Sequence, residues 1–110
     1  MDVNPLSPGH ALVVPKQEMA ELHMLSAESA AALGAALPLV AGAIMQATSA
    51  AAYNILQNNG ALAHQAVMHV HFHIIPRIGS AGLGVGWNSG TLSASDASEL
   101  VTNMQAALHA

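Results

Sequence analysis

Three of the seven histidines lie within five residues of one another, as His69, His71 and His73. They alternate with apolar residues such as Val70 and Phe72, and alternation with a period of two places every second side chain on the same face of a β-strand. Three polar rings beside aliphatic neighbours are costly unless they are hydrogen-bonded or used in chemistry. The pattern therefore predicts a functional site on one face of a strand.

A neutral imidazole is a nucleophile near pH 7, because one ring nitrogen has a free lone pair. If His71 attacks through one nitrogen, its other nitrogen must donate to an acceptor such as a backbone carbonyl. Crowding of the rings disfavours double protonation, so we expect the cluster to be largely neutral. The flanking histidines, the turn at residues 58–60 and the loop before Val67 could donate to a phosphoryl group. These residues predict nucleophilic attack by histidine on phosphorus.

Histidines at positions i and i+2 of a strand could instead share a zinc ion. The chain contains no cysteine, and no carboxylate lies within several residues of the three histidines, so further ligands would have to come from elsewhere. We therefore expect no metal in the site and no required cofactor, and we keep a zinc-binding module as an alternative.

The rest of the chain carries few charges. Its 110 residues include 2 Lys and Arg and 6 Asp and Glu, for a net charge of −4. Two cations cannot neutralise a row of phosphates, which argues against a nucleic-acid polymer as partner and against an anionic membrane surface. No secretory signal follows Met1, so we expect a cytoplasmic protein, with a nuclear location as the variant. Residues 30–45 lack polar side chains, but Ala and Gly are common there and Pro38 interrupts them, so we interpret them as part of a core helix rather than a membrane span.

Three short apolar or β-branched runs, each bounded by a turn signal, predict strands at residues 10–14, 53–57 and 67–75. Ser26 is typical of a helix N-cap, and the helix it begins should continue to about Ser49. Its buried stripe is predicted from helical spacing: Leu33, Leu37, Val40 and Ile44.

A final helix is predicted to begin at Ser93 or Ser95 and to present Leu100, Met104 and Leu108 on one side. No linker separates the predicted elements. We therefore expect a single domain over residues 1–110, with an α+β fold whose strands and helices share one core.

The segment from His69 to Ile75 resembles the signature of the histidine triad (HIT) family, which is His-x-His-x-His followed by apolar residues. The resemblance extends, in the family's order and spacing, to residues 2–5, 8–16 and 57–60, to Gln65 and to the Pro76-Arg77 pair. It implies a HIT-like antiparallel sheet with one long helix and a C-terminal helix. Members of the family carry roughly one more hairpin before the position of Asp2, so we expect a HIT domain that is short at its N-terminus.

The resemblance also implies a role for each of four histidines. His71 matches the nucleophile that attacks the α-phosphorus of a nucleotide, giving a nucleotidyl-histidine intermediate that water hydrolyses. His73 matches a ligand of the phosphate oxygens. His69 matches the histidine that orients the nucleophile, and His10 matches an upstream histidine that completes the hydrogen-bonded cluster.

Five further residues are implied to bind the substrate. Asp2 matches a carboxylate that holds the ribose hydroxyls, and Asn58 matches a polar residue near the phosphate and the leaving group. His64 and Gln65 stand where Gly-Gln is commoner, and the His64 ring could either face the phosphate or cover the loop. Ala66 would contribute its backbone amide.

Asn58 resembles the Hint branch of the family, the nucleoside phosphoramidases, more than the Fhit branch, which has Gln there. The expected function is therefore cleavage of adenosine 5'-phosphoramidates or related AMP-X compounds through His71. The alternatives are a Fhit-like dinucleoside polyphosphate hydrolase and a non-catalytic nucleotide-binding or zinc-binding module. The expected partners are a purine nucleotide and a second copy of the chain, because members of this branch are usually homodimers.

Overall fold

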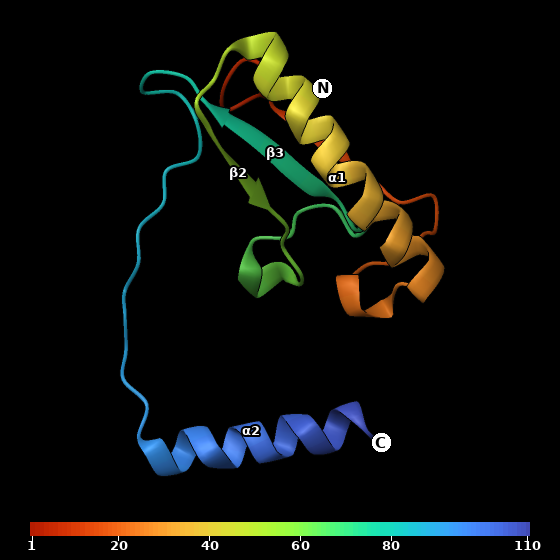
Figure 1. Ribbon diagram of the computed structural model, residues 1–110, viewed down its shortest axis with the longest axis vertical. Helices are drawn as coiled ribbons and strands as arrows, with labels where there is room; N and C mark the ends of the chain where they lie inside the picture. The colour runs from red at the N-terminus through yellow and green to blue at the C-terminus, as the bar shows by residue number, and fades with distance from the viewer.

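The computed structural model describes residues 1–110. One long helix lies across a small sheet, and a second helix stands apart from both (Figure 1). The elements in chain order are β1 (Ala11–Val13), the short helix η1 (Leu22–Met24), α1 (Ala27–Thr48), β2 (Ala52–Leu56), the short helix η2 (Ala61–Ala63), β3 (Phe72–Arg77) and α2 (Ala94–Leu108). The predicted α+β class is confirmed.

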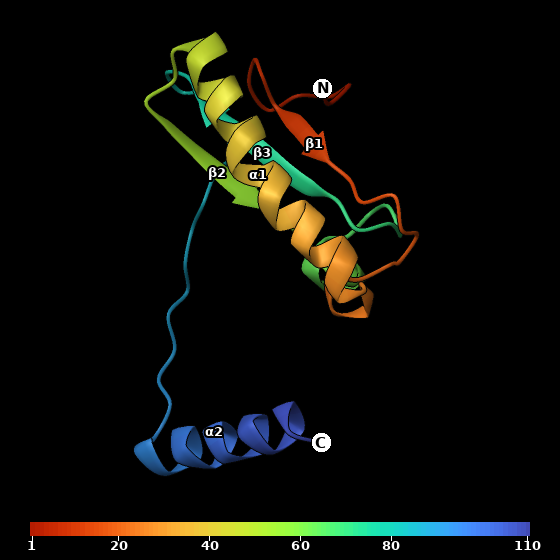
Figure 2. The same ribbon diagram turned by 45° about the vertical axis from the view of Figure 1, so that its right-hand side comes forward.

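The sheet is antiparallel, with β3 between β1 and β2. β1 pairs with the first half of β3, so that Ala11 lies opposite Ile74 and Leu12 opposite His73. β2 pairs with β3 from Leu56, opposite His73, to Ala52, opposite Arg77. This register places Leu12 of β1 beside His73, and the residues before β1 lie along the second half of β3, with the N-terminus near the start of β1 (Figure 2).

The α1 helix begins where the sequence predicted, because the Ser26 hydroxyl accepts a 3.1 Å hydrogen bond from the Ser29 N–H. Leu33 and Ala41 are its buried residues, while the other predicted stripe positions are half-buried. The helix continues through Pro38. It is long and apolar enough to cross a membrane by length and composition alone, with a mean hydropathy of 1.7 and 11% of that stretch buried. Its inner side packs against β1 and β3.

The third strand begins later than predicted. Residues 67–71 lie outside any strand, and β3 starts at Phe72. The reason is long-range, since the Val70 N–H donates to the Met19 carbonyl rather than to a neighbouring strand. The predicted strand is therefore wrong over residues 67–71, and strand alternation does not account for the positions of His69 and His71. At its other end β3 runs on through Pro76, whose carbonyl accepts a hydrogen bond from the buried Ser7 hydroxyl.

The prediction that all helices and strands share one core is wrong for the C-terminal helix, which lies outside the core. The core is formed by β1, β3 and α1 with the segment before β3, and its fully buried side chains include Val70, Ile74 and Ile75. Ser93, the first of the two predicted caps, is the N-cap of α2, but the helix contains no buried residue. The radius of gyration is 16.8 Å, whereas a compact chain of this length would have about 13 Å. The extended segment before α2 holds it away from the body (Figure 1).

Candidate active site

The site is built where β1 and β3 pair. His10 stands just before β1 and is 2% exposed, while His73 lies in β3 with 19% of its side chain exposed. The two residues are 63 positions apart in the chain, yet His10 Nε2 and His73 Nδ1 are 2.9 Å apart. His71 joins them, with its ring centroid 5.0 Å from that of His73 and nearly perpendicular to it.

A backbone amide fixes which nitrogen of His10 carries the proton. The Leu6 N–H donates to His10 Nδ1 over 3.1 Å, so the neutral ring must carry its hydrogen on Nε2. His10 Nε2–H then donates to His73 Nδ1, which leaves the hydrogen of neutral His73 on Nε2. His73 is therefore prepared to donate from Nε2 to an oxygen of a ligand.

The orientation of His71 is fixed in the same way. Its Nδ1–H donates to the His69 carbonyl over 2.7 Å, which leaves the lone pair on Nε2 free. No group of the protein is hydrogen-bonded to that nitrogen. A nucleophilic imidazole requires this arrangement. The backbone carbonyl that the sequence analysis expected as acceptor for His71 is that of His69.

His69 does not place its ring beside His71. Its Nε2–H donates to the Pro15 carbonyl, 3.0 Å away at the end of β1. The ring therefore anchors the backbone of His69, and the carbonyl of the same residue orients His71. Sequence reasoning identified the four histidines but not the two backbone groups that orient them, the Leu6 N–H and the Pro15 carbonyl.

The carboxylate of Asp2 lies against the same cluster. Its Oδ1 accepts from the Asn4 N–H at 2.9 Å, and its Oδ2 is 3.4 Å from His10 Nε2 and 3.9 Å from His73 Nδ1. The Asn4 N–H lowers the pKa of Asp2, and His10 and His73 lower it further. The ribose role that the resemblance implies for Asp2 stays a prediction, and the structure places one of its oxygens near His10 and His73.

Burial lowers the pKa of His73 below its usual 6.5. His71 and His10 lower it further, and Asp2 acts in the opposite direction. The ring is therefore neutral at pH 7, in agreement with the expectation from the sequence that the crowded cluster is largely neutral.

The loop before the histidines is held by Gln65. This side chain is 4% exposed; its Oε1 accepts from the Gly60 N–H, and its Nε2 donates to the carbonyls of Ala20 and Val67. The amide group is bonded to three backbone groups, so Gln65 supports the loop, and the substrate role that the resemblance implies for it stays a prediction.

The remaining implied substrate residues surround that loop. Ala66, Val67 and Met68 are exposed residues, and their backbone N–H groups donate to no group of the protein. Asn58 is half-buried and its side-chain amide is free, while His64 is exposed and has a positive φ of 69°. The structure thus leaves free donors on the chain segment that leads into the histidines.

One carboxylate and two imidazoles are close enough to bind a metal ion, since donor atoms of Asp2, His10 and His73 all lie within 4.8 Å of one another. A neutral histidine that binds a metal through Nε2 carries its hydrogen on Nδ1 and donates it to an acceptor. His10 Nδ1 instead faces the N–H donor of Leu6. This contact favours a proton on Nε2 of His10 over a metal.

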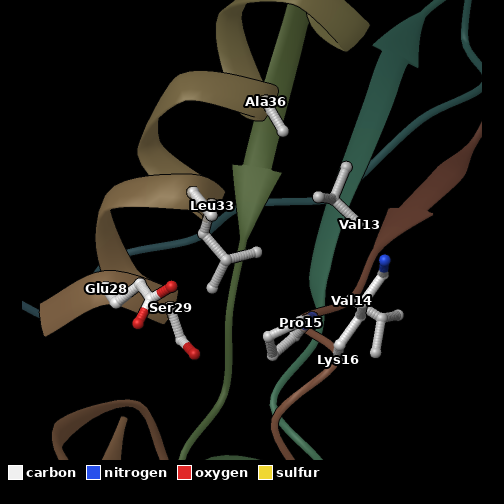
Figure 3. A pocket seen from close by; sticks show the side chains of 9 residues that line it. Val13, Val14, Pro15, Lys16, Glu28, Ser29, Leu33 and Ala36 are labelled. Atoms are coloured by element: carbon white, nitrogen blue, oxygen red, sulfur yellow. The ribbon is translucent and has the colours of Figure 1, made fainter. Parts of the chain in front are cut away.

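Two clefts lie along α1, and no histidine lines either of them. One, of about 440 Å³, opens between α1 and the end of β1; its walls are Leu33 and Ala36 on one side and Val13 to Lys16 on the other (Figure 3). The second, of about 550 Å³, lies between Gly9 and Ala11 and the last turns of α1. Both are mostly apolar surfaces of the long helix.

The sequence profile of the HIT domain matches residues 1–79. The chain belongs to the HIT family. The four histidines of the site and the sheet that positions them lie within the matched residues, so the recognition made from the His-x-His-x-His segment is confirmed, as is the Hint-like branch.

Similar proteins include two named enzymes. The chain is 52% identical over 94 residues to adenosine 5'-monophosphoramidase hnt1 of Schizosaccharomyces pombe, a match that covers 84% of this chain and 68% of that one. It is 44% identical over 77 residues to adenylylsulfatase HINT3 of Arabidopsis thaliana, which covers 70% of this chain and 39% of that one. The chain therefore spans less than half of the second relative.

A solved structure of a hypothetical protein from Leishmania major has the same HIT fold, with a TM-score of 0.92 and 43% identity. The superposition covers 99% of this chain and 78% of the other. The superposed share of this chain includes α2.

Proposed function

We propose that this HIT protein hydrolyses adenosine 5'-phosphoramidates and related AMP-X compounds through a nucleotidyl-histidine intermediate on His71. The observation that carries the proposal is the 2.7 Å hydrogen bond from His71 Nδ1 to the His69 carbonyl. This bond keeps the ring hydrogen on Nδ1 and leaves the lone pair of Nε2 free. The named relatives, a monophosphoramidase and an adenylylsulfatase, support the AMP half of the substrate.

The reaction has two steps. In the first, the lone pair of His71 Nε2 forms a bond to the α-phosphorus, the bond from phosphorus to the leaving group breaks, and the leaving amine departs with that electron pair and takes up a proton. In the second, water attacks the same phosphorus, the bond to Nε2 breaks, and AMP and a proton are released. His71 keeps its Nδ1–H on the His69 carbonyl throughout, which disperses the positive charge that forms on the ring.

Neutral donors would bind the phosphoryl oxygens. His73 Nε2–H is held in the donor state by the bond from His10, and the free amides of Ala66, Val67 and Met68 precede the triad. Preorganised N–H groups stabilise the negative charge that develops on phosphoryl oxygens without reorganising during the reaction. This explains how a chain with 2 cationic side chains could act on a phosphate.

The test compares His71→Asn with His23→Asn, the same substitution at a histidine whose side chain is 72% exposed outside the cluster. We expect His71→Asn to abolish release of AMP from adenosine phosphoramidate and His23→Asn to leave it unchanged. Wild-type turnover of adenylyl sulfate and of diadenosine polyphosphates, compared with that of adenosine phosphoramidate, defines the preferred leaving group. A preference for diadenosine polyphosphates would favour the Fhit-like alternative. Turnover retained by His71→Asn would refute the mechanism.

We also propose that the protein is a homodimer in the cytoplasm. Two exposed apolar surfaces, on α2 and on α1, favour contact with a second copy of the chain. α2 has no buried residue, and its apolar side chains occupy about 100° of the helix circumference: Ala97, Leu100, Val101, Met104 and Leu108. The outer side of α1 is also apolar, with Leu39 76% exposed beside the 550 Å³ cleft. An isolated helix of this length is marginal in water, so α2 needs a partner surface.

Light scattering on the purified chain measures this directly. We expect the mass of two chains, and we expect Met104→Glu to shift the protein toward one chain, whereas Thr102→Glu on the opposite side of α2 leaves the dimer intact. A wild type with the mass of one chain at micromolar concentration would overturn the dimer proposal. Flotation with lipid vesicles would instead assign the apolar surfaces to a membrane, and fractionation of cells that express a tagged chain tests the location.

A further inference from the structure

The side chains of Gln57 and Asn59 bind each other through two hydrogen bonds. Gln57 Nε2 donates to Asn59 Oδ1 over 2.9 Å, and Asn59 Nδ2 donates to Gln57 Oε1 over 2.5 Å. The Leu22 N–H donates to the same Asn59 Oδ1 over 2.7 Å, which ties this amide pair to η1. Gln57 and Asn59 are both half-buried, so their mutual bonds are stronger than they would be in water.

Asn58 lies between the two paired residues and has a free side-chain amide. Its carbonyl accepts from Gln57 Nε2 over 3.2 Å, and the N–H of Gly60, which follows the pair, donates to the buried Gln65 side chain. The backbone is therefore held on both sides of Asn58. Because Gln57 and Asn59 use their amides on each other, Asn58 is the one of the three whose donors and acceptor are all available to a ligand.

The register of the sheet gives the position of Asn58. β2 ends at Leu56, which lies opposite His73, and the two residues from Leu56 to Asn58 span at most about 7 Å. Asn58 therefore lies at the end of the sheet that carries His73. A ligand bound by His73 would meet there an amide that can both donate and accept.

We propose that Gln57 and Asn59 are positioning residues that act through Asn58: their amide pair fixes the backbone so that the Asn58 side chain hydrogen-bonds the phosphoryl end of the AMP-X substrate. A binding group that is fixed in advance loses less conformational entropy when the substrate arrives, and its position relative to the reacting atoms is maintained. The substrate part of this inference rests on the proposed function, whereas the ordering of Asn58 by the amide pair does not.

Four variants test the inference. Gln57→Met removes one amide of the pair and keeps the length of the side chain. Gln57→Glu, which retains the acceptor for Asn59 Nδ2, replaces it if Gln57→Met does not fold. Asn58→Ala removes the free amide itself, and Gln46→Met makes the first substitution at an exposed position of α1 as the control.

The first measurement is the NMR relaxation of the Asn58 backbone amide, which needs no substrate. We expect an order parameter of about 0.85 in the wild type and in Gln46→Met, and a fall to below about 0.6 in Gln57→Met. An unchanged order parameter in Gln57→Met would overturn the inference even if the protein hydrolyses AMP-X compounds. The expected fall, together with a wild type that hydrolyses none of them, would support the ordering of Asn58 and refute the proposed function.

The second measurement is a double-mutant cycle on kcat/KM with adenosine phosphoramidate. We expect Gln57→Met and Asn58→Ala each to lower kcat/KM about 10-fold. The double variant should also lose about 10-fold rather than about 100-fold, because both substitutions remove the same contact. Structural damage by Gln57→Met that did not involve Asn58 would instead multiply with the effect of Asn58→Ala. Multiplied effects in the double variant, or an unchanged kcat/KM in Gln57→Met, would overturn the inference.

Discussion

Replacing Gln65 by Ala tests whether this side chain supports the histidine loop or binds substrate. The substitution removes three hydrogen bonds to backbone groups, of 2.7, 2.6 and 2.9 Å. Each is worth about 0.5–1.5 kcal/mol net, so their sum is about 1.5–4.5 kcal/mol. Water that enters the space left by the side chain recovers part of this, and we expect a loss of about 2–3 kcal/mol.

The loss should be seen in urea unfolding and as a lowered Tm, since about 4–8 °C accompanies each kcal/mol in a domain of this size. Gln46→Ala removes the same side chain from an exposed position of α1 and should change stability by less than about 0.5 kcal/mol. Because Gln65 joins the Gly60 turn and the Ala20 segment to Val67, we also expect kcat to fall.

Two results would refute this reasoning about Gln65. One is a free energy of unfolding that matches the wild type. The other is a rise in KM at unchanged stability and kcat, which is the signature of a residue that binds the substrate directly. Either would mean that the buried amide is replaced by water at no cost.

Two further predictions concern stability. Gly9 has a φ of +92°, and a Cβ there would lie 2.7 Å from Thr48 Cγ2, so Gly9→Ala should lower the free energy of unfolding by about 1–3 kcal/mol. A Cβ at Gly42 in α1 would meet nothing within 4 Å, so Gly42→Ala should raise it by about 0.5–1 kcal/mol. Urea unfolding compares the two variants, and equal effects would refute the argument. Because the pKa of His73 is below 6.5 in the folded chain, the unfolded chain binds more protons as pH falls below 6.5. The free energy of unfolding should therefore decrease from pH 7.5 to pH 5.5, and the decrease should be smaller in His73→Gln. A rise in the free energy of unfolding as pH is lowered over this range would contradict the direction of the pKa shift.

The features that could be predicted from the sequence are those determined by neighbouring residues. Ser26 caps α1 because its hydroxyl reaches an amide three positions away, and the spacing of Leu33 and Leu37 places them on the inner side of the same helix. The His-x-His-x-His segment likewise identified His71 and His73, which lie together with His10 in the structure. Each of these inferences uses interactions within about one helical turn.

The features that could not be predicted depend on contacts between distant segments. Val70 bonds to Met19, which delays the start of β3, and Gln65 bonds to Ala20, 45 positions away. The isolation of α2 from the core could not be predicted either. Its amphipathic pattern indicates that one face is buried, but not which surface covers that face. The direction of Asp2 depends on a turn at Asn4 that follows no periodic pattern.

The histidine cluster acquires its chemistry from backbone groups rather than from charged side chains. Leu6 N–H determines the tautomer of His10, His10 determines that of His73, and the His69 carbonyl determines that of His71. Donors fixed in this way are neutral, so salt screens their interaction with a phosphoryl group less than it would screen an arginine. A change of one proton at His73 alters the direction of its hydrogen bond with His10. Activity should therefore depend strongly on pH and weakly on ionic strength, the opposite of a phosphate site built from Lys and Arg.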